Sequence, residues 1–594
     1  MSVSRLQNTY KERHRDFSAQ LSAITRRINI ISNLRLTAAV LGILSFYFSL
    51  TNVSIAGITV GLLVIFFYLV QSHARLFREK IHLENLVRIN KGEMNALSGN
   101  FSSFTPGNEF VDPHHPYTHD LDIFGDGSLY QYINRCNTIN GRKNLAQHLE
   151  NPLNAQKSIQ RQQDAIRDLS TRIDLRQHLQ AAGMEMGEQP ADHQQLLRWS
   201  LQPPVFQKMR LISLLLMTIP PLTVLCLIAT LYVPQAKLAL MFLIIVQWII
   251  TASNLRQINV FHDYISRKKS ILQKYSRLLQ YIENEKFSST KLQEISGQAR
   301  EAHAKVGQLA SLVSALDART NSMTTLVVNS LLLYDLQCVY RLERWREENA
   351  GKLSVWLDAI TEVECVSSLA TFAYNHPDFK FATIHSEIRI SATRMTHPLI
   401  PEAERVYNDM AIGSNDSVMI ITGANMAGKS TFLRTLGVNM VLALNGAPVC
   451  ASEFFCPLIE IRSGMRTADS LKDHQSYFYA ELNRLKGIMD ELRTDKPLLI
   501  LLDEILKGTN SNDKQAGSIS LVRQLLPHPC LALIATHDLA LGDLEKEYPD
   551  RIKNYCFEAT ITDDQLFFDY KLKQGVAKNM NASFLMKKMG IIPK

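Results

Sequence analysis

The chain has 594 residues, which is too long for a single hydrophobic core and predicts two to four domains. Its hydrophobic fraction of 46% and charged fraction of 20% are those of a globular protein, and a formal net charge of +8 is too small in a chain of this length to indicate a nucleic-acid or anionic-membrane partner by itself. The 8 cysteines include no C-x-x-C pair and no matching histidine spacing, which argues against a zinc site or a disulfide framework and favours a reducing compartment.

Two apolar stretches near the N-terminus are joined by a very short connection. They cover residues 36–50 and 53–70, and only Thr51 and Asn52 separate them. The second stretch reaches the roughly 17 to 20 apolar residues that a helix needs to cross a bilayer, and tilt or thinning would accommodate the shorter one. Basic residues flank the pair on both outer sides: Arg26, Arg27, Arg35, Arg75, Arg78 and Lys80. The pattern predicts a transmembrane helical hairpin at about 36–70.

A second pair of apolar stretches covers residues 211–233 and 238–252, with a similarly short connection at 234–237. Basic residues again flank the pair: Lys208, Arg210, Arg256, Arg267, Lys268 and Lys269. By the positive-inside rule, the outer ends of both pairs and both chain termini are expected in the cytoplasm. The alternative is a pair of buried helical hairpins in a soluble core, and Pro220 with Pro221 inside the third stretch gives that alternative some weight.

The middle of the chain has a helical pattern. It begins near Ser128, continues to about Trp199, and resumes after the second apolar pair from Arg256 to about Ala373. A segment rich in Gly, Ser, Pro and His precedes it and predicts a linker at 96–119.

After Asn375 the pattern changes to short β-rich runs and glycine turns that alternate with helices. Two of the runs lie at 388–392 and 417–422. This alternation is typical of an α/β domain with a largely parallel sheet.

A glycine-rich loop follows the apolar run 418–421 and precedes the helical run 432–444. Loops of this kind let backbone N–H groups cradle phosphates at a helix N-terminus. Lys429 is expected to reach the β- and γ-phosphates, and Ser430 to ligate Mg²⁺. The predicted phosphate-binding residues are Gly423, Asn425, Met426, Gly428, Lys429, Ser430 and Thr431.

A second apolar run, 498–502, ends in Asp503 and Glu504. By itself, such a pair of carboxylates is often only the solvent-exposed end of a strand. Beside a phosphate loop it predicts that Asp503 holds the metal and that Glu504 polarises the attacking water. A third run, 531–535, ends in Thr536 and His537, and His537 is a candidate sensor of the γ-phosphate.

Together these residues resemble the MutS family rather than phosphate-loop proteins in general. The loop has the Asn425-Met426 pair of that family, and the carboxylate strand continues as Asp503-Glu-Ile-Leu-Lys-Gly508-Thr509, similar to the family's Asp-Glu-Ile-Gly-Arg-Gly-Thr. Two positions depart from the pattern, with Leu506 in place of Gly and Lys507 in place of Arg. The resemblance covers about residues 120–590 and implies ATP with Mg²⁺ as cofactors.

The segment from Asp469 to Phe478, with Glu481, resembles the family's signature segment. In that family a serine there reaches the γ-phosphate bound by the partner subunit, and Ser476 is the matching position. The resemblance therefore implies a homodimer with composite ATP sites.

The expected fold class is an α/β P-loop ATPase domain of the ABC and MutS type, preceded by an all-α core and lever region and two transmembrane hairpins. The layout is 1–95 with the first hairpin, the linker 96–119, a first core part 120–207, the second hairpin 208–255, a second core and lever part 256–375, and the ATPase domain 376–594.

A membrane hairpin stands where a mismatch-reading domain is expected, and Phe77-Arg-Glu79 fits the family's wedge pattern only by spacing. The predicted hairpins imply a membrane-anchored, multi-pass protein, in the inner membrane if the protein is bacterial, and the resemblance implies an ATPase that binds DNA for mismatch repair or related processing. The alternative is a DNA-independent membrane machine that acts on a protein or lipid partner.

Overall fold

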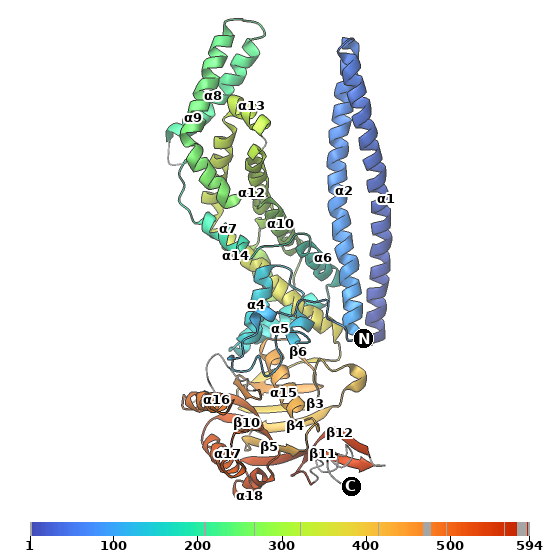
Figure 1. Cartoon of the computed structure of the whole chain (residues 1–594), viewed down its shortest axis with the longest axis vertical. Helices are drawn as coiled ribbons and strands as arrows, with labels where there is room; N and C mark the ends of the chain where they lie inside the picture. Colours follow the sequence, from blue (N-terminus) through green and yellow to red (C-terminus); the bar gives the residue numbers. More distant parts are fainter. Residues whose placement is uncertain are drawn as a thin grey trace.

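The computed structural model describes residues 3–206, 210–266, 268–320, 322–413, 415–466, 477–494, 496–562, 565–578 and 591. The molecule is elongated (Figure 1). An α/β domain lies at one end, a helical core lies in the middle, and two helical arms project from the core away from the α/β domain.

The first arm is an antiparallel pair of long helices, α1 (Val3–Ser49) and α2 (Ala56–Leu97), joined by a turn and the short 3-10 helix η1 (Val53–Ile55). The apolar stretches 36–50 and 53–70 form the outer part of this arm, and the helices continue well beyond them towards the core. Apolar side chains of this outer part point outward; Leu36 is 67% exposed and Ile43 is 71% exposed.

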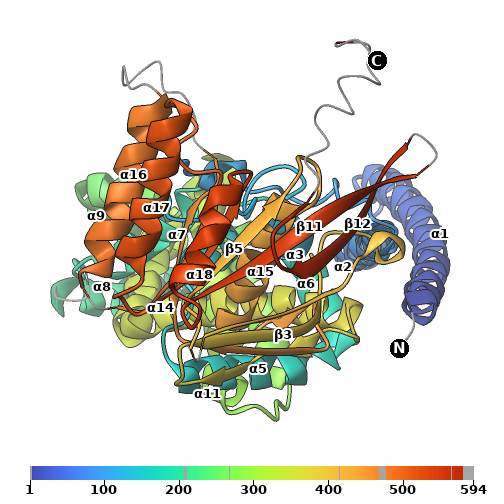
Figure 2. The ribbon, with the colours of Figure 1, turned by 90° about the horizontal axis from the view of Figure 1, so that it is seen from below.

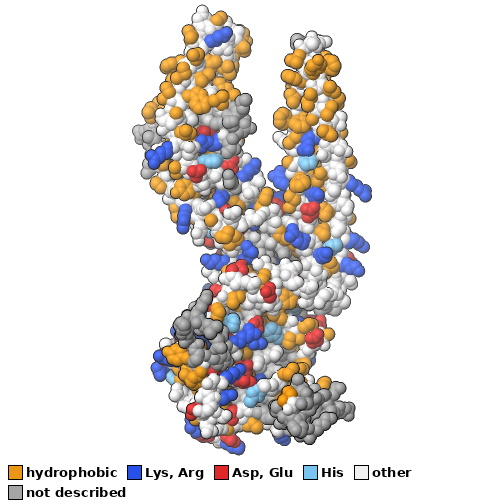
Figure 3. Space-filling view, viewed as in Figure 1, with side chains coloured by type: hydrophobic (Ala, Val, Ile, Leu, Met, Phe, Trp, Pro, Cys, Tyr) orange, Lys and Arg blue, Asp and Glu red, His pale blue; other side chains and the backbone are white. Residues whose placement is uncertain are grey.

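The second arm consists of α8 (Arg210–Ala229) and α9 (Ala236–Ile265), with α13 (Ser322–Leu332) packed beside them. Helix α9 continues past residue 255, the expected end of the hairpin. Gln247 and Thr223, both 0% exposed, join the two long helices, since the Gln247 amide donates to Thr223 Oγ1 at 2.7 Å. In the space-filling view, apolar side chains cover the outer parts of both arms, and most basic side chains lie nearer the core (Figure 3).

The helical core connects the arms to the α/β domain. Its longest element is α14 (Tyr334–Asn375), which runs from the base of the second arm to the first strand. The other helices of the core are α3 (Leu129–Ile133), α4 (Ile139–Glu150), α5 (Gln156–Ser170), α6 (Ile173–Gly183), α7 (Asp192–Ser200), α10 (Lys269–Asn284), α11 (Thr290–Gln298) and α12 (Ala302–Asp317). The predicted all-helical middle is confirmed.

The segment predicted as a linker, 96–119, is attached to regular structure at both ends. Its first two residues belong to α2, and the chain that follows it packs against the α/β domain. The Asp120 carboxylate is fully buried and accepts hydrogen bonds from Ser463 Oγ at 2.7 Å, the Met465 N–H at 3.1 Å and Arg484 Nη2 at 2.8 Å. Composition predicted a linker here, but it could not show that a buried carboxylate would attach the chain directly after that segment to the sheet.

A junction network joins the first arm to the end of α14. Tyr10 Oη donates to Asn375 Oδ1 at 2.7 Å, and Asn375 Nδ2 donates to Glu93 Oε2 at 2.9 Å. Arg135 Nε donates to Glu93 Oε1 at 2.5 Å, and its guanidinium lies over the Phe104 ring at 3.6 Å. The four residues Tyr10, Glu93, Arg135 and Asn375 are all buried, so both helices of the arm are held where the core meets the α/β domain.

The α/β domain contains a six-stranded sheet in the order β12-β11-β5-β10-β9-β8. All neighbours pair in parallel except β11 and β12, so the expected largely parallel sheet is confirmed. Its strands are β5 (Val418–Gly423), β8 (Glu460–Gly464), β9 (Leu498–Asp503), β10 (Cys530–Thr536), β11 (Ile552–Thr562) and β12 (Gln565–Gln574).

Helices cover both faces of this sheet, which explains its continuous apolar runs. Alternate residues of β5 belong to two hydrophobic clusters, with Met419 and Ile421 in one and Val418 and Ile420 in the other. Helix α15 (Lys429–Leu444) packs on the first face. Helices α16 (Tyr477–Leu492) and α17 (Ser511–Leu525) pack on the second, side by side in the view from below (Figure 2). The short helix α18 (Leu544–Glu547) precedes β11.

A second, mainly antiparallel sheet has the order β2-β7-β3-β4, and a two-stranded sheet pairs β1 with β6. These strands are β1 (Lys380–Phe381), β2 (Thr383–His385), β3 (Arg389–Met395), β4 (Asn408–Gly413), β6 (Pro448–Val449) and β7 (Glu453–Pro457). Of the strands in these two smaller sheets, the sequence analysis predicted only β3. The other strands are short, and their partners are distant in sequence.

Candidate functional site

The predicted site residues converge because three parallel strands end at one edge of the sheet. Thr422 on β5 lies opposite Thr536 on β10, and Asp503 on β9 lies opposite Ala535. The segments after these strands carry the glycine loop, Glu504 and His537, and they therefore meet at that edge.

The glycine loop passes from β5 into α15 through conformations that favour glycine. Gly423 has φ 152° and Gly428 has φ 106°. A Cβ on Gly423 would lie 2.5 Å from the Phe557 carbonyl oxygen, so the close approach of β11 requires glycine there. Met426 also has a positive φ of 67°. The loop directs its backbone towards the N-terminus of α15, an arrangement suited to anions.

Lys429 is the first residue of α15 and is buried. Its Nζ donates to the carbonyl oxygens of Gly423 and Ala424, at 2.9 Å each, and lies 3.5 Å from His537 Nδ1. Burial lowers the pKa of the Lys429 ammonium, and the nearby carboxylates of Glu504 and Asp503 oppose that shift. The ammonium is thus held inside the loop, close to the carboxylate strand.

Glu504 and His537 are in direct contact. His537 Nε2 lies 2.6 Å from Glu504 Oε1, and Lys507 Nζ lies 3.3 Å from Glu504 Oε2. The contact with His537 lowers the pKa of Glu504 to about 2, with a further contribution from Lys507, so the carboxylate is ionised at neutral pH.

Asp503 and Ser430 are the candidate metal ligands. Asp503 Oδ1 is buried and has no hydrogen-bond partner among the described residues, which fits a carboxylate that binds a metal or its water. No group of three or more His, Cys, Asp or Glu suited to a metal occurs in the described part of the chain. Mg²⁺ suits such a sparse set of ligands, because it keeps several waters and takes substrate phosphates as further ligands.

The two residues that depart from the family pattern, Leu506 and Lys507, both make specific contacts in the structure. Leu506 has φ 59°, a conformation that favours glycine, and its side chain occupies space that a Cβ on Gly517 would fill, at 2.6 Å. Lys507 forms the ion pair with Glu504. The Glu481 carboxylate accepts the backbone N–H groups of Leu506 at 2.5 Å and Lys507 at 3.2 Å, so α16 holds this turn in place.

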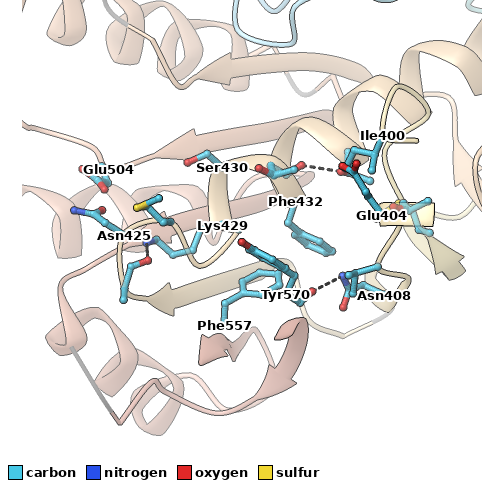
Figure 4. Close-up of a pocket in the computed structure, with 18 residues that line it drawn as sticks. Ile400, Glu404, Asn408, Asn425, Lys429, Ser430, Phe432, Glu504, Phe557 and Tyr570 are labelled. Carbon is cyan, nitrogen blue, oxygen red and sulfur yellow. Dashed lines mark hydrogen bonds between the residues drawn. The ribbon is translucent and has the colours of Figure 1, made fainter. Parts of the chain in front are cut away.

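A cavity of about 440 Å³ opens beside the glycine loop (Figure 4). One wall is the loop and the start of α15. The opposite wall carries Tyr570 of β12, Asn408 of β4 and Phe557 of β11. Asn408 fixes the position of β12, since its Nδ2 donates to the Tyr570 carbonyl at 3.0 Å and its Oδ1 accepts the Leu572 N–H at 2.8 Å.

The structure brings most of the predicted site residues together. Those that line the cavity are Asn425, Met426, Gly428, Lys429, Ser430, Thr431 and Glu504. Gly423 ends β5, and Asp503 and His537 adjoin the cavity residues. Ser476 lies outside the described residues. The sequence analysis did not identify Tyr570, Asn408 and Phe557 as site residues. The aromatic content of β11 and β12 was a signal for Tyr570 and Phe557, and no sequence signal marked Asn408.

Comparisons with known proteins agree with this geometry. The family model for MutS domain V matches residues 419–594. The chain is 29% identical over 235 residues to the DNA mismatch repair protein MutS of Thermotoga maritima, a match that covers 39% of this chain and 29% of that protein. It is 32% identical over 260 residues to the protein of the same name from Chlorobaculum tepidum, covering 42% and 28% of the two chains.

The chain thus spans less than a third of the length of these curated relatives. The match includes the glycine loop, the carboxylate strand and the strand that ends in Thr536, which are the elements that build the cavity edge. The sequence match and the geometry of the site agree that residues 419–594, which form most of the α/β domain, belong to the MutS domain V family.

Proposed function

We propose that the protein binds and hydrolyses ATP with Mg²⁺ in the cavity beside the glycine loop. The observation that carries this proposal is the convergence of Lys429, Glu504, His537 and the buried Asp503 at one sheet edge. Family membership supports it, because the matched domain V is of the ATPase type.

Each of these residues has a separate role in phosphoryl transfer to water. Loop N–H groups and the Lys429 ammonium bind the phosphates, and Ser430 with Asp503 would hold Mg²⁺, which neutralises phosphate charge when bound. The ionised Glu504 carboxylate accepts a proton from the attacking water, and His537 orients that carboxylate through its 2.6 Å contact. Tyr570 presents a ring on which a nucleotide base can stack.

The substitution Lys429→Ala tests whether Lys429 binds the phosphates of ATP. Loss of a charged donor predicts an ATP affinity lower by about 10- to 100-fold. The measurement is equilibrium binding of a fluorescent ATP analogue to detergent-purified protein. The exposed Lys486 on α16 provides the control, and Lys486→Ala is expected to bind normally. Equal affinity of the wild type and Lys429→Ala would contradict the role of Lys429.

We also propose that the two arms cross a membrane, with the α/β domain on the cytoplasmic side. Four helices have the length and apolar composition for this: Ser4–Ser49, Ala56–Leu97, Leu211–Ala229 and Ala236–Ile265. Their apolar side chains are largely exposed, and the two arms project in the same direction (Figures 1 and 3). Resistance of the cellular protein to carbonate extraction tests this proposal, and full release into the soluble fraction would contradict it.

The active unit proposed here is a homodimer in which Ser476 of one subunit completes the site of the other. Mixing inactive Lys429→Ala and Ser476→Ala proteins then leaves one intact composite site in each mixed dimer, and some hydrolysis should return. Absence of recovery in dimers proven to be mixed would contradict the composite site.

The proposed target is DNA, as the names of the matched relatives suggest. A second candidate, a DNA-independent machine that acts on a membrane partner, is favoured by the exposed apolar arms. The deciding experiment is ATP turnover by detergent-purified protein without DNA, with perfect duplex and with mismatched or branched DNA. Stimulation by any DNA supports the first candidate, and its ranking of substrates indicates the target. Equal turnover in all three conditions supports the second.

A further inference from the structure

A groove of about 790 Å³ lies between α8 and the adjoining ends of α13 and α14, remote from the nucleotide cavity. Its α8 wall is apolar and includes Met217, Pro220, Pro221 and Leu225. Because proline has no N–H, the helix carbonyls four residues before the two prolines lack their usual donors. Carbonyls freed in this way can accept hydrogen bonds from hydroxyl groups of a ligand.

The α14 wall of the same groove is polar and cationic. It carries Tyr340, Arg341 and Arg344, and both arginines are exposed. Arg341 forms no ion pair with any described residue, and Arg344 has only a surface contact with Glu348 at 3.0 Å. Exposed pairs of this kind contribute little, so both guanidiniums are available to an anion. The planar guanidinium fork is well suited to phosphate oxygens.

The groove is polar at one end and apolar at the other. Ser213 Oγ lies 3.2 Å from Tyr340 Oη, which places the polar end near the start of α8, on the side of the helical core. Val224 and Ile228 line the apolar end, towards the tip of the arm. From Ser213 to Ile228 the helix rises about 22 Å. That length covers a phospholipid headgroup together with the roughly 15 Å of acyl chain in one leaflet.

We propose that this groove binds one anionic phospholipid of the cytoplasmic leaflet, with its phosphate on Arg341 and Arg344 and an acyl chain along the proline face of α8. The proposal rests on the proposed crossing of the membrane by the second arm. It places the lipid against α14, the 42-residue helix that continues to the junction network, so the same helix contacts the lipid groove and the base of the α/β domain.

The test measures lipid binding to the full-length, detergent-purified protein by native mass spectrometry. Phosphatidylglycerol and phosphatidylcholine are titrated in parallel, and inorganic phosphate is added as a competitor. The wild type should bind one phosphatidylglycerol at least about tenfold more tightly than phosphatidylcholine, because charge-assisted hydrogen bonds to the arginines distinguish the headgroups. Inorganic phosphate should not displace the lipid, since it cannot occupy the apolar end.

Three variants make the test specific to the groove. Arg341→Gln with Arg344→Gln should lose the preference for phosphatidylglycerol, and Val224→Trp, which fills the apolar end, should weaken binding of both lipids. Arg75→Gln with Arg78→Gln removes the same charge from exposed positions of the first arm and should retain the preference. Equal binding of the two lipids by the wild type, or equal loss in the two double variants, would overturn the proposal.

Carbonate extraction of each variant separates this proposal from the membrane proposal. A protein that stays in the membrane yet shows no lipid preference overturns only the lipid site, whereas a fully soluble wild type overturns both. The competing occupant is a second copy of the chain. Leu225→Cys would then form a disulfide-linked dimer in high yield whatever lipid is added, and that result would also overturn the lipid site.

Discussion

The two ends of the molecule place the same apolar residue types in opposite environments. In the parallel sheet, Val418 and Leu498 are both 0% exposed, because α15 covers one face of the sheet and α16 with α17 covers the other. In the first arm, Leu36 and Ile43 are 67% and 71% exposed. An apolar run therefore specifies an apolar environment but not the source of that environment, which is the chain itself at one end and, in our proposal, a bilayer at the other.

The junction network is where the two ends meet. Tyr10 and Glu93 come from the two helices of the first arm, and Asn375 is the last residue of α14 before the first strand. A change at either end should therefore leave the other end intact, whereas a change in this network should affect both.

The largest expected effect is on turnover. Glu504→Gln should lower ATP hydrolysis by about 10²- to 10⁴-fold, the usual contribution of a general base. ATP binding should stay close to that of the wild type, because the phosphate contacts are provided by other residues. The measurements are steady-state phosphate release and equilibrium nucleotide binding. Carbonate resistance should not change, and equal loss of binding and turnover would contradict the assigned role.

A change at the junction should cost the most stability. Glu93→Gln keeps the shape of the side chain but leaves Arg135 as an uncompensated buried charge, which typically costs about 3–5 kcal/mol. A clear fall in the thermal unfolding midpoint of the detergent-purified protein is expected. Arg523→Gln breaks the exposed pair with Glu547 and serves as the control, with no measurable change in the midpoint expected. Equal midpoints for the two variants would show that the network does not stabilise the junction.

A change in the arm should act on membrane retention alone. Leu44 is 50% exposed, and Leu44→Arg would place a charge in the bilayer at a cost of roughly 2.5–3.5 kcal/mol. The carbonate-resistant fraction should fall while ATP affinity is unchanged. Val111→Arg alters an exposed apolar residue outside the arms and should affect neither property. Normal retention of Leu44→Arg would argue that this side chain does not face lipid.

The smallest expected effect is the pH dependence of stability near the junction. Burial lowers the pKa of His376 to about 4; its Nδ1 lies 2.9 Å from the Phe372 carbonyl and its Nε2 lies 2.8 Å from Tyr132 Oη. Between pH 6.5 and 4 the unfolded chain therefore binds more protons at this residue than the folded chain does. The contribution of His376 to the free energy of unfolding is therefore fully present above pH 6.5. It falls as the pH drops towards 4, by at most about 1.4 kcal/mol per pH unit.

Unfolding midpoints between pH 7 and 4.5 provide the measurement for this histidine. His376→Gln should flatten the slope, whereas His114→Gln, at an exposed position, should keep it. A slope that is the same in both variants would show that His376 does not titrate as its burial implies.

Much of the proposed nucleotide site was predictable because it is built from contiguous motifs. The glycine loop, Asp503 with Glu504, and His537 each follow an apolar run, and parallel strands bring such strand ends to one edge. Tyr570 and Asn408 could not be predicted as cavity residues. They come from strands more than a hundred residues apart in sequence, and the hydrogen bond from Asn408 to the Tyr570 carbonyl exists only in the folded domain.

The positions that depart from the family pattern also show what the sequence alone could not predict. The sequence marks Leu506 as unusual, but only the structure shows a positive φ there and a side chain packed in the space that Gly517 leaves open. Likewise, composition predicted a loop before Ser128 without indicating that Asp120 would be buried among Ser463, Met465 and Arg484.

By itself, the sequence determined the local structures: the helical middle, the apolar helices with basic flanks, and the strand, loop and helix around Lys429. Periodicity, glycine conformation and apolar run length are local properties, so they can be recognised without knowing what packs against them. Tertiary structure alone decided which apolar surfaces are covered, which strands form the far wall of the cavity, and which buried charges pair across the junction. Those outcomes depend on contacts between residues that are distant in the chain, and no local pattern encodes them.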